Sequence, residues 1–265
     1  MPRRKERILR PVHPNIGISA AYRRRLEALI AEMQASYLYW LKAQYRETPP
    51  AMAADATPAK ELERELKKLG KRWRERIDEG APKLAKWFLK AASKRSDDAL
   101  RKILRDAGFS VKFAMTKSMR DVMTATLADN VSLIKSIGSQ YHTEVEGLVM
   151  RSVTAGRDLA SLTDELEKRY GVTRRRAALI SRDQNNKATA SMTRARQRDI
   201  GIEEAVWLHS HGGKEPRPTH LANSGKRYRV SEGWFDPDPK VQRRIWPGEL
   251  ISCRCVSRPV VKGFS

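Results

Sequence analysis

Two stretches decide the fold of the C-terminal part of this chain: Trp207-Leu-His-Ser-His-Gly-Gly-Lys-Glu-Pro-Arg-Pro-Thr-His220 and Trp246-Pro-Gly-Glu-Leu-Ile-Ser-Cys-Arg-Cys255. Both cysteines of the chain and three of its five histidines lie in these stretches. Glycines and prolines concentrate here as well, whereas the residues before Trp207 mostly follow the apolar spacing of helices. We therefore expect a compact, loop-rich module that the preceding helices present or anchor.

The histidines and cysteines of this module form a candidate metal site. Structural zinc takes four Cys or His ligands in a tetrahedral arrangement. His220, Cys253 and Cys255 are the expected ligands, and His209 is the expected fourth, with His211 or a water molecule as the alternatives. A disulfide between cysteines one residue apart would be strained, so we expect free thiols or metal ligands. The predicted cofactor is therefore a structural zinc ion, and the alternative is a core of buried thiols with histidines bonded to backbone carbonyls.

Two other interpretations of the module stay open on the residues alone. Its large aromatic side chains favour a docking surface; they are Trp207, Trp234, Trp246 and Tyr228. A Cys–His pair or a His-rich loop is also compatible with a nucleophilic enzyme or a metal-dependent nuclease. The carboxylates of the module have no spacing typical of a two-metal nuclease, so we predict no catalytic residues and no enzymatic activity.

The charge of the chain favours a polyanionic partner. Lysine and arginine total 53 against 31 aspartate and glutamate residues, a formal net charge of +22. Such a balance is typical of proteins that lie beside nucleic acid. The candidate contacts to nucleic acid or to another partner are Arg174, Arg175, Arg176, Arg182, Lys226 and Arg227. The arginines at 174–176 begin an expected helix, where positive charge opposes the helix dipole, so phosphates, an acidic partner or internal carboxylates must compensate them.

The predicted fold class is mainly α with a small C-terminal α+β module. We expect a basic arm over residues 1–17, a helical region over 18–150 and the module over 151–265. No run of about 18 apolar residues occurs, so no membrane anchor is expected. The expected strands follow residue 202 and comprise residues 205–208, 227–230 and 256–261.

Apolar spacing and punctuating residues predict a series of separate helices. The first covers residues 19–46 with Ser19 as its N-cap, and a flexible linker with three prolines follows over 48–58. The later helices are expected to break at Gly80-Ala-Pro82, to restart at Ser96 and to end at Gly108. Another helix is expected from 156–158 to Tyr170-Gly171, before a long helix at about 173–200 that Thr173 caps and Gly201 ends.

An ordered string of motifs resembles the Mu protein F-like minor head proteins of tailed phages, also called the phage head morphogenesis family. The resemblance covers roughly residues 150–261, and its motifs are Ile180-Ser-Arg-Asp-Gln184, Trp207-Leu-His-Ser210, Gly213-Lys-Glu-Pro-Arg-Pro-Thr-His220, Asn223-Ser-Gly-Lys-Arg-Tyr228, Trp246-Pro-Gly-Glu-Leu250 and Cys253-Arg-Cys255. The residues before 150 carry no quoted motif of that family.

The resemblance implies a minor capsid protein of the virion that acts at the portal vertex. Its expected role is head assembly, DNA packaging or DNA delivery, and its expected partners are the portal protein, other head proteins and double-stranded DNA. It implies assembly in the host bacterial cytoplasm and a final place in the capsid interior or at the portal vertex. The alternative is a DNA-binding protein that guides or condenses the packaged genome.

Overall fold

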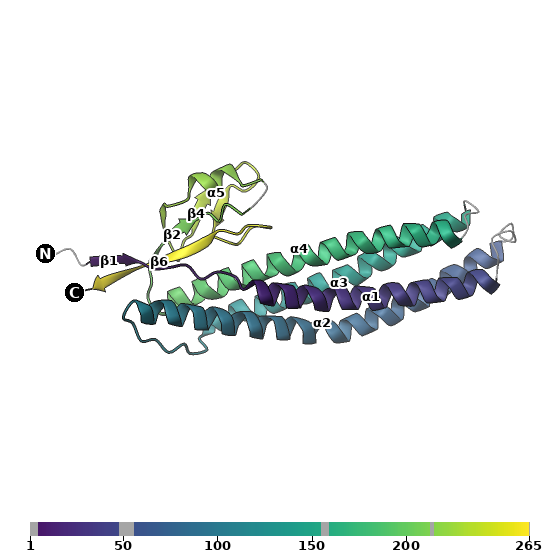
Figure 1. The fold of residues 1–265 in the computed structure, drawn as a ribbon, viewed down its shortest axis with the longest axis horizontal. Coiled ribbons are helices and arrows are strands. Elements are labelled where there is room, and N and C mark those ends of the chain that lie inside the picture. Colours follow the sequence, from purple (N-terminus) through teal and green to yellow (C-terminus); the bar gives the residue numbers. More distant parts are fainter. Residues whose placement is uncertain (1–4, 48–55, 155–158, 213–214, 265) are drawn as a thin grey trace. The chain divides into compact units, whose positions relative to one another are not determined.

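The computed structural model describes residues 5–47, 56–154, 159–212 and 215–264, which form mostly helices followed by short strands (Figure 1). The predicted class, mainly α with a small C-terminal α+β module, is confirmed. The elements in chain order are β1 (Lys5–Ile8), α1 (Ile16–Glu47), α2 (Ala56–Asp106), α3 (Lys117–Thr154), α4 (Leu159–Asp199), β2 (Glu204–Leu208), α5 (Pro218–Ala222), β3 (Arg227–Arg229), β4 (Trp234–Asp236), β5 (Arg243–Ile245) and β6 (Val256–Phe264).

The chain forms two compact units that do not follow the order of the sequence. The first unit contains the described parts of residues 1–19, 87–128 and 182–265, and the second contains those of 20–86 and 129–181. Each of the helices α2, α3 and α4 therefore contributes one segment to each unit. This division differs from the expected sequential one, which placed its boundaries after residues 17 and 150.

The second unit is a bundle of four helix segments, one from each of α1 to α4. Helix α1 buries the face that the apolar spacing predicted, with Tyr22, Leu26, Ile30, Met33, Tyr37 and Leu41 all excluded from solvent. Buried polar contacts join α1 to α3, since the Tyr22 hydroxyl donates to Asn130 Oδ1 at 3.1 Å. Burial of this continuous face is the main stabilising term expected for such a bundle.

Several expected helix boundaries are wrong, because packing overrides the local signals. Helix α2 continues through Gly80, Pro82 and Ser96, and α4 continues through Gly171 and Thr173. An internal proline costs about 3 kcal/mol, which a long buried face can offset. Thr173 does not cap a helix; its hydroxyl donates to the carbonyl of Arg169 one turn earlier, at 3.0 Å. The expected linker lies mostly outside the described residues, as do residues 156–158.

The helix ends expected at Gly108 and Gly201 are confirmed, whereas the first N-cap is not Ser19. Gly108 and Gly201 follow α2 and α4 with φ of 93° and 76°, the left-handed region that favours glycine. Helix α1 begins three residues before Ser19, and the Asn15 side-chain oxygen accepts the N–H of Ile18 at 3.1 Å. Asn15 is therefore the N-cap, consistent with the preference for asparagine at this position.

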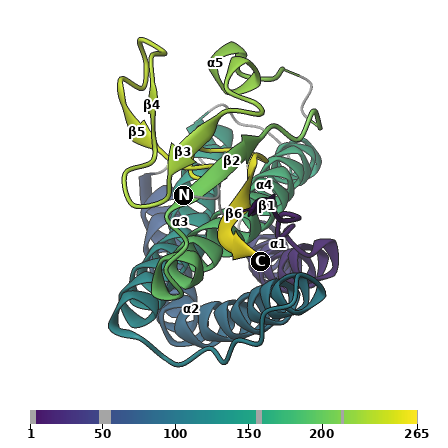
Figure 2. The same cartoon turned by 90° about the vertical axis from the view of Figure 1, so that its left-hand side faces the viewer.

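The first unit contains an antiparallel sheet of four strands in the order β1-β6-β2-β3 and a separate β4–β5 pair (Figure 2). The predicted strands at 205–208, 227–230 and 256–261 correspond to β2, β3 and β6. Strand β1 was missed, because residues 5–8 pair with β6 through the backbone while their mixed basic sequence has no apolar alternation. The segment expected as a free arm is thus an edge strand, and Leu9 and Val12 beyond it are buried against Leu100 and Leu104 of α2.

None of the described helices combines the length and apolar character needed to span a bilayer.

A buried histidine couples α1, α2 and α3 in the second unit. The Tyr37 hydroxyl donates to His142 Nδ1 at 2.6 Å, since burial raises the pKa of Tyr37 and keeps its proton in place. A Cβ atom on Gly70 would lie 2.2 Å from the His142 ring, so only glycine leaves room at this helix crossing. Burial lowers the pKa of His142, and the carboxylate of Glu146 partly opposes that shift.

The lowered pKa of His142 predicts a loss of stability in acid. The unfolded chain takes up a proton below about pH 6.5, whereas the folded chain resists it, so the free energy of unfolding falls as the pH drops through this range. We expect the urea midpoint to fall between about pH 7 and about pH 5, and to fall less in His142→Gln. The exposed His13 provides the control variant His13→Gln, which should keep the wild-type dependence. Equal pH dependence in wild type and His142→Gln would contradict this assignment.

Candidate metal centre

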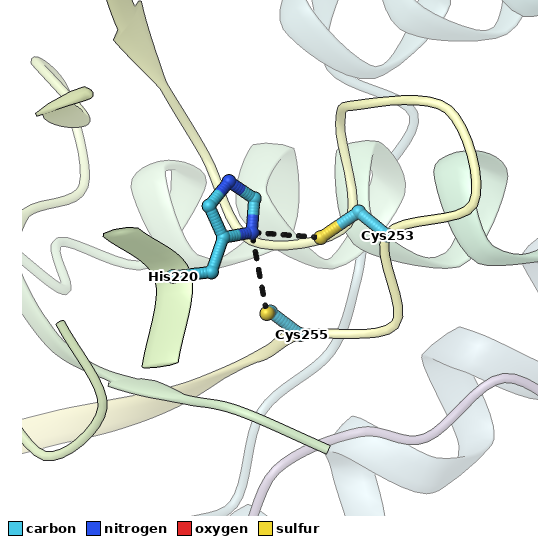
Figure 3. Close-up of side chains that lie close together, drawn as sticks. All are labelled: His220, Cys253 and Cys255. Atoms are coloured by element: carbon cyan, nitrogen blue, oxygen red, sulfur yellow. Dashed lines mark hydrogen bonds between the residues drawn. The ribbon is translucent and has the colours of Figure 1, made fainter. Parts of the chain in front are cut away.

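Three buried side chains from two separate segments converge in the first unit (Figure 3). His220 lies in the short helix α5, and Cys253 and Cys255 lie in the turn before β6. His220 Nδ1 is 3.5 Å from Cys253 Sγ and 3.6 Å from Cys255 Sγ. The three ligand atoms all lie within 4.8 Å of one another. The structure therefore brings together three of the four predicted ligands.

The opposite edge of the His220 ring is held by a carboxylate that the sequence did not single out. Nε2 of His220 lies 3.2 Å from Asp236 Oδ2, and Asp236 is completely buried at the end of β4. The other carboxylate oxygen accepts the backbone N–H of Asp238 at 3.0 Å. This pair fixes the imidazole with Nδ1 toward the sulfur atoms. The sequence shows Asp236 only as one of several carboxylates, and no spacing marks it.

Helix α4 holds the turn that carries the cysteines. The carboxylate of Asp183 accepts the backbone N–H of Ser252 at 2.6 Å, and the Asn186 amide donates to the carbonyl of Cys253 at 3.2 Å. Ser252 has φ of 60°, a left-handed conformation that needs such support. The segment that leads into this turn also packs closely on α4. A Cβ atom on Gly248 would lie 2.8 Å from Ala190 Cβ, so the chain at Gly248 leaves no room for a larger residue. Two polar side chains of α4 thus determine where the thiols lie.

Two of the four large aromatic side chains of the module are buried in its core, and the other two are half-buried against it. Trp207 is fully buried and meets the rings of His220 and Trp234 edge-on, at centroid distances of 5.1 Å and 5.4 Å. Tyr228 is buried in the same cluster, and the Trp246 indole donates to the carbonyl of Val230 at 2.9 Å. The expectation of an exposed apolar surface is therefore wrong for Trp207 and Tyr228, which are buried, whereas Trp234 and Trp246 are half-buried.

A hydrogen bond between the two thiols shifts their pKa values in opposite directions. The hydrogen bond from the Cys255 thiol lowers the pKa of Cys253, and the same bond together with burial raises the pKa of Cys255. The backbone N–H of Cys255 also points to Cys253 and lowers the pKa of that thiol, as the N–H of Ser210 does for Cys255. Removing the second proton requires a compensating positive charge near both sulfur atoms.

His209, the expected fourth ligand, does not join the cluster. Its side chain is buried, and its Nδ1 accepts the backbone N–H of His211 at 3.1 Å. A neutral imidazole has one acceptor and one donor nitrogen, so Nε2 of His209 carries the proton in this arrangement. Burial lowers the pKa of His209 and maintains the neutral form.

The predicted basic contact residues divide into paired and free side chains. Arg174 forms an ion pair with Glu27 at 3.5 Å, and Arg227 forms one with Glu6 at 2.8 Å. Arg176 donates to the carbonyl of Ser136 at 3.3 Å and to its hydroxyl at 3.0 Å. The remaining predicted contacts have exposed side chains; they are Arg175, Arg182 and Lys226. Carboxylates of the chain therefore pair with two of the six side chains, and neutral oxygen atoms bind a third.

The contact between α4 and the cysteine turn gives a prediction. Asp183→Ala leaves the Ser252 N–H without its acceptor, so we expect a loss of about 1–3 kcal/mol in the free energy of unfolding. Lys187→Ala is the matched control, because it removes only the ion pair to Asp183, 2.9 Å long, and should change stability by less than about 1 kcal/mol. Urea denaturation of the three proteins measures both effects, and equal losses in the two variants would contradict the role assigned to Asp183.

Comparisons with known proteins show one family model that resembles this region. Residues 143–258 match the family model described as Phage Mu protein F like protein. A protein of Haemophilus influenzae described only as an uncharacterized protein is 33% identical over 147 residues, which cover 54% of this chain and 30% of that protein. The chain thus spans about a third of the length of that curated relative. No solved structure gives a significant match.

Proposed function

Because residues 143–258 match the family model described as Phage Mu protein F like protein, we propose that the chain is a phage head morphogenesis protein that acts at the portal vertex. We assign it to the minor capsid proteins of the virion, with a role in head assembly, DNA packaging or DNA delivery. Its proposed partners are the portal protein and other head proteins. The observation that carries this proposal is the family match over that region.

The geometry supports the assignment, because motifs far apart in the matched region meet in one place. Asp183 of the first motif binds the turn that carries the Cys-Arg-Cys motif, and His220 of another motif faces both thiols. Trp207 covers the His220 ring. The ordered string of motifs therefore describes one packed module rather than unrelated short matches.

The module exposes a few large apolar side chains that we propose as anchors for the portal. Leu221, Phe235 and Ile251 are 42%, 52% and 64% exposed. Apolar anchors of this kind carry much of the binding energy in protein interfaces. Trp207 and Tyr228 cannot serve as such anchors, because both side chains are buried in the core.

The anchors predict a portal-binding defect in a double variant. Co-expression with the portal protein of the same phage, followed by pull-down at low and high salt, should recover a complex that persists at high salt. Phe235→Ser with Ile251→Ser should reduce recovery at least tenfold, which corresponds to about 1.4 kcal/mol. Tyr39→Ser changes a side chain that is 81% exposed but lies outside the matched region, and it should bind like wild type. No complex of the wild-type protein at either salt concentration would refute the portal assignment.

A second function, direct contact with packaged DNA, is favoured by a basic groove in the first unit. The groove has a volume of about 600 Å³ and lies between the segment of residues 10–13 and α2. Its lining contains the basic side chains Arg10, His13, Arg95, Arg101, Lys102 and Arg105. Carboxylates nearby pair with part of this charge, since Arg10 binds Asp106 at 2.6 Å and Arg101 binds Asp98 at 2.9 Å. Arg95 and Arg105 form no ion pair with any of the described residues, and their side chains are exposed to solvent.

DNA contact at the groove predicts a specific change in salt dependence. Each phosphate contact adds about 0.9 to the slope of log affinity against log salt, so Arg95→Gln with Arg105→Gln should lower that slope by about 1.8. Fluorescence anisotropy with a labelled duplex measures it. The control Lys86→Gln with Lys90→Gln removes the same charge from exposed positions outside the groove and should leave the slope nearly unchanged. Equal slopes for the groove variant and wild type would exclude this groove as the DNA site.

A further inference from the structure

We propose that His220 Nδ1, Cys253 Sγ and Cys255 Sγ bind a zinc ion that cross-links helix α5 to the turn before β6. The inference concerns how the module is held together, and it does not depend on a role at the portal. It goes beyond the family match, which assigns no ligand to these side chains. Three features of the site support zinc binding: the spacing of the ligand atoms, the orientation of the histidine and the charge of the pocket.

The spacing of the ligand atoms fits a tetrahedral zinc ion. With Zn–S bonds of about 2.3 Å and Zn–N bonds of about 2.1 Å, tetrahedral geometry places a sulfur and a nitrogen ligand about 3.6 Å apart. The two S–N distances are 3.5 Å and 3.6 Å. A hydrogen bond explains this arrangement less well, because one imidazole nitrogen has either one lone pair or one N–H and here faces two sulfur atoms equally. Figure 3 shows both sulfur atoms directed to the same ring nitrogen.

The orientation of His220 is that of a metal ligand. Asp236 Oδ2 lies 3.2 Å from Nε2, so the ring proton resides on Nε2 and the lone pair of Nδ1 points to the sulfur atoms. A carboxylate on the far nitrogen is the usual companion of a zinc-bound histidine, because it fixes the tautomer and raises the basicity of the ligand. Asp236 is thus a positioning residue that acts through His220.

The buried charge of the pocket favours a cation. Asp236 is completely buried, and among the described residues no lysine or arginine forms an ion pair with it. His220, Cys253 and Cys255 are also buried. A buried carboxylate whose only ionisable partner in the described part of the chain is an imidazole is unfavourable in a low-dielectric interior, and a cation bound by that imidazole compensates it. Both cysteines bind zinc as thiolates, so binding releases the thiol protons to solvent.

Water completes the tetrahedron in this arrangement. His209 is the nearest expected alternative, but its Nδ1 is occupied by the N–H of His211 and its Nε2 carries the proton. It therefore offers no free lone pair. The zinc ion therefore has three protein ligands. Of the two buried histidines, His220 binds the ion and His209 does not.

Metal analysis of the full-length chain, purified without a polyhistidine tag or chelator, tests the proposal. We expect about one zinc per chain by mass spectrometry. His220→Gln and Cys255→Ser should lose the zinc, whereas His209→Gln and the exposed control His211→Asn should retain it. Loss of zinc in His209→Gln would overturn the assignment of water to the fourth position.

Two further measurements keep the test decisive if ligand variants fail to fold. Removal of zinc from wild-type protein with a chelator should lower the melting temperature, and zinc but not magnesium should restore it. Asp236→Asn should weaken zinc binding about 10–100-fold in competition with a chromophoric chelator, while the exposed control Glu232→Gln should not. Wild-type protein with far less than one zinc per chain, whose melting temperature does not rise when zinc is added, would overturn the proposal.

Discussion

The position of two thiols beside one imidazole nitrogen is the constraint on which the C-terminal module depends. Cys253 and Cys255 reach this point only because Asp183 and Asn186 of α4 bind the turn that carries them. His220 reaches it because Asp236 fixes the far side of its ring. The module has short strands and few buried side chains, so a single cross-link of this kind can contribute a large share of its stability.

The second unit is stabilised by a different set of interactions. Its four helix segments bury long apolar faces, and the Tyr22–Asn130 and Tyr37–His142 contacts satisfy polar groups inside the bundle. Such buried hydrogen bonds favour one helix register over its alternatives, because a shifted register leaves them unpaired. The second unit therefore relies on continuous apolar burial, whereas the C-terminal module of the first unit combines an apolar cluster with polar contacts and a candidate metal site.

The sequence predicted the features that local pattern determines. The apolar stripe of α1, the glycines that end α2 and α4, and the strands β2, β3 and β6 all follow from spacing and residue type. The breaks expected at Pro82 and Thr173 did not occur, because burial of a long helix face outweighs a single unfavourable residue. Strand β1 was missed because an edge strand needs only backbone pairing.

The sequence identified the candidate ligands of the site, but not the side chains that hold those ligands in position. The residue types alone indicated His220, Cys253 and Cys255, since soft thiolates and imidazole suit zinc. Asp183 and Asp236 were indistinguishable from other carboxylates, because their roles arise from distances across the fold. The exclusion of His209 likewise follows from one backbone hydrogen bond, which no spacing reveals.

Zinc-edge X-ray absorption of the purified chain tests the central claim most directly. We predict a four-coordinate ion with two sulfur ligands at about 2.3 Å and two nitrogen or oxygen ligands at about 2.0–2.1 Å, one of them an imidazole. A first shell of oxygen and nitrogen alone, or the absence of a zinc edge from protein that is folded, would contradict the account.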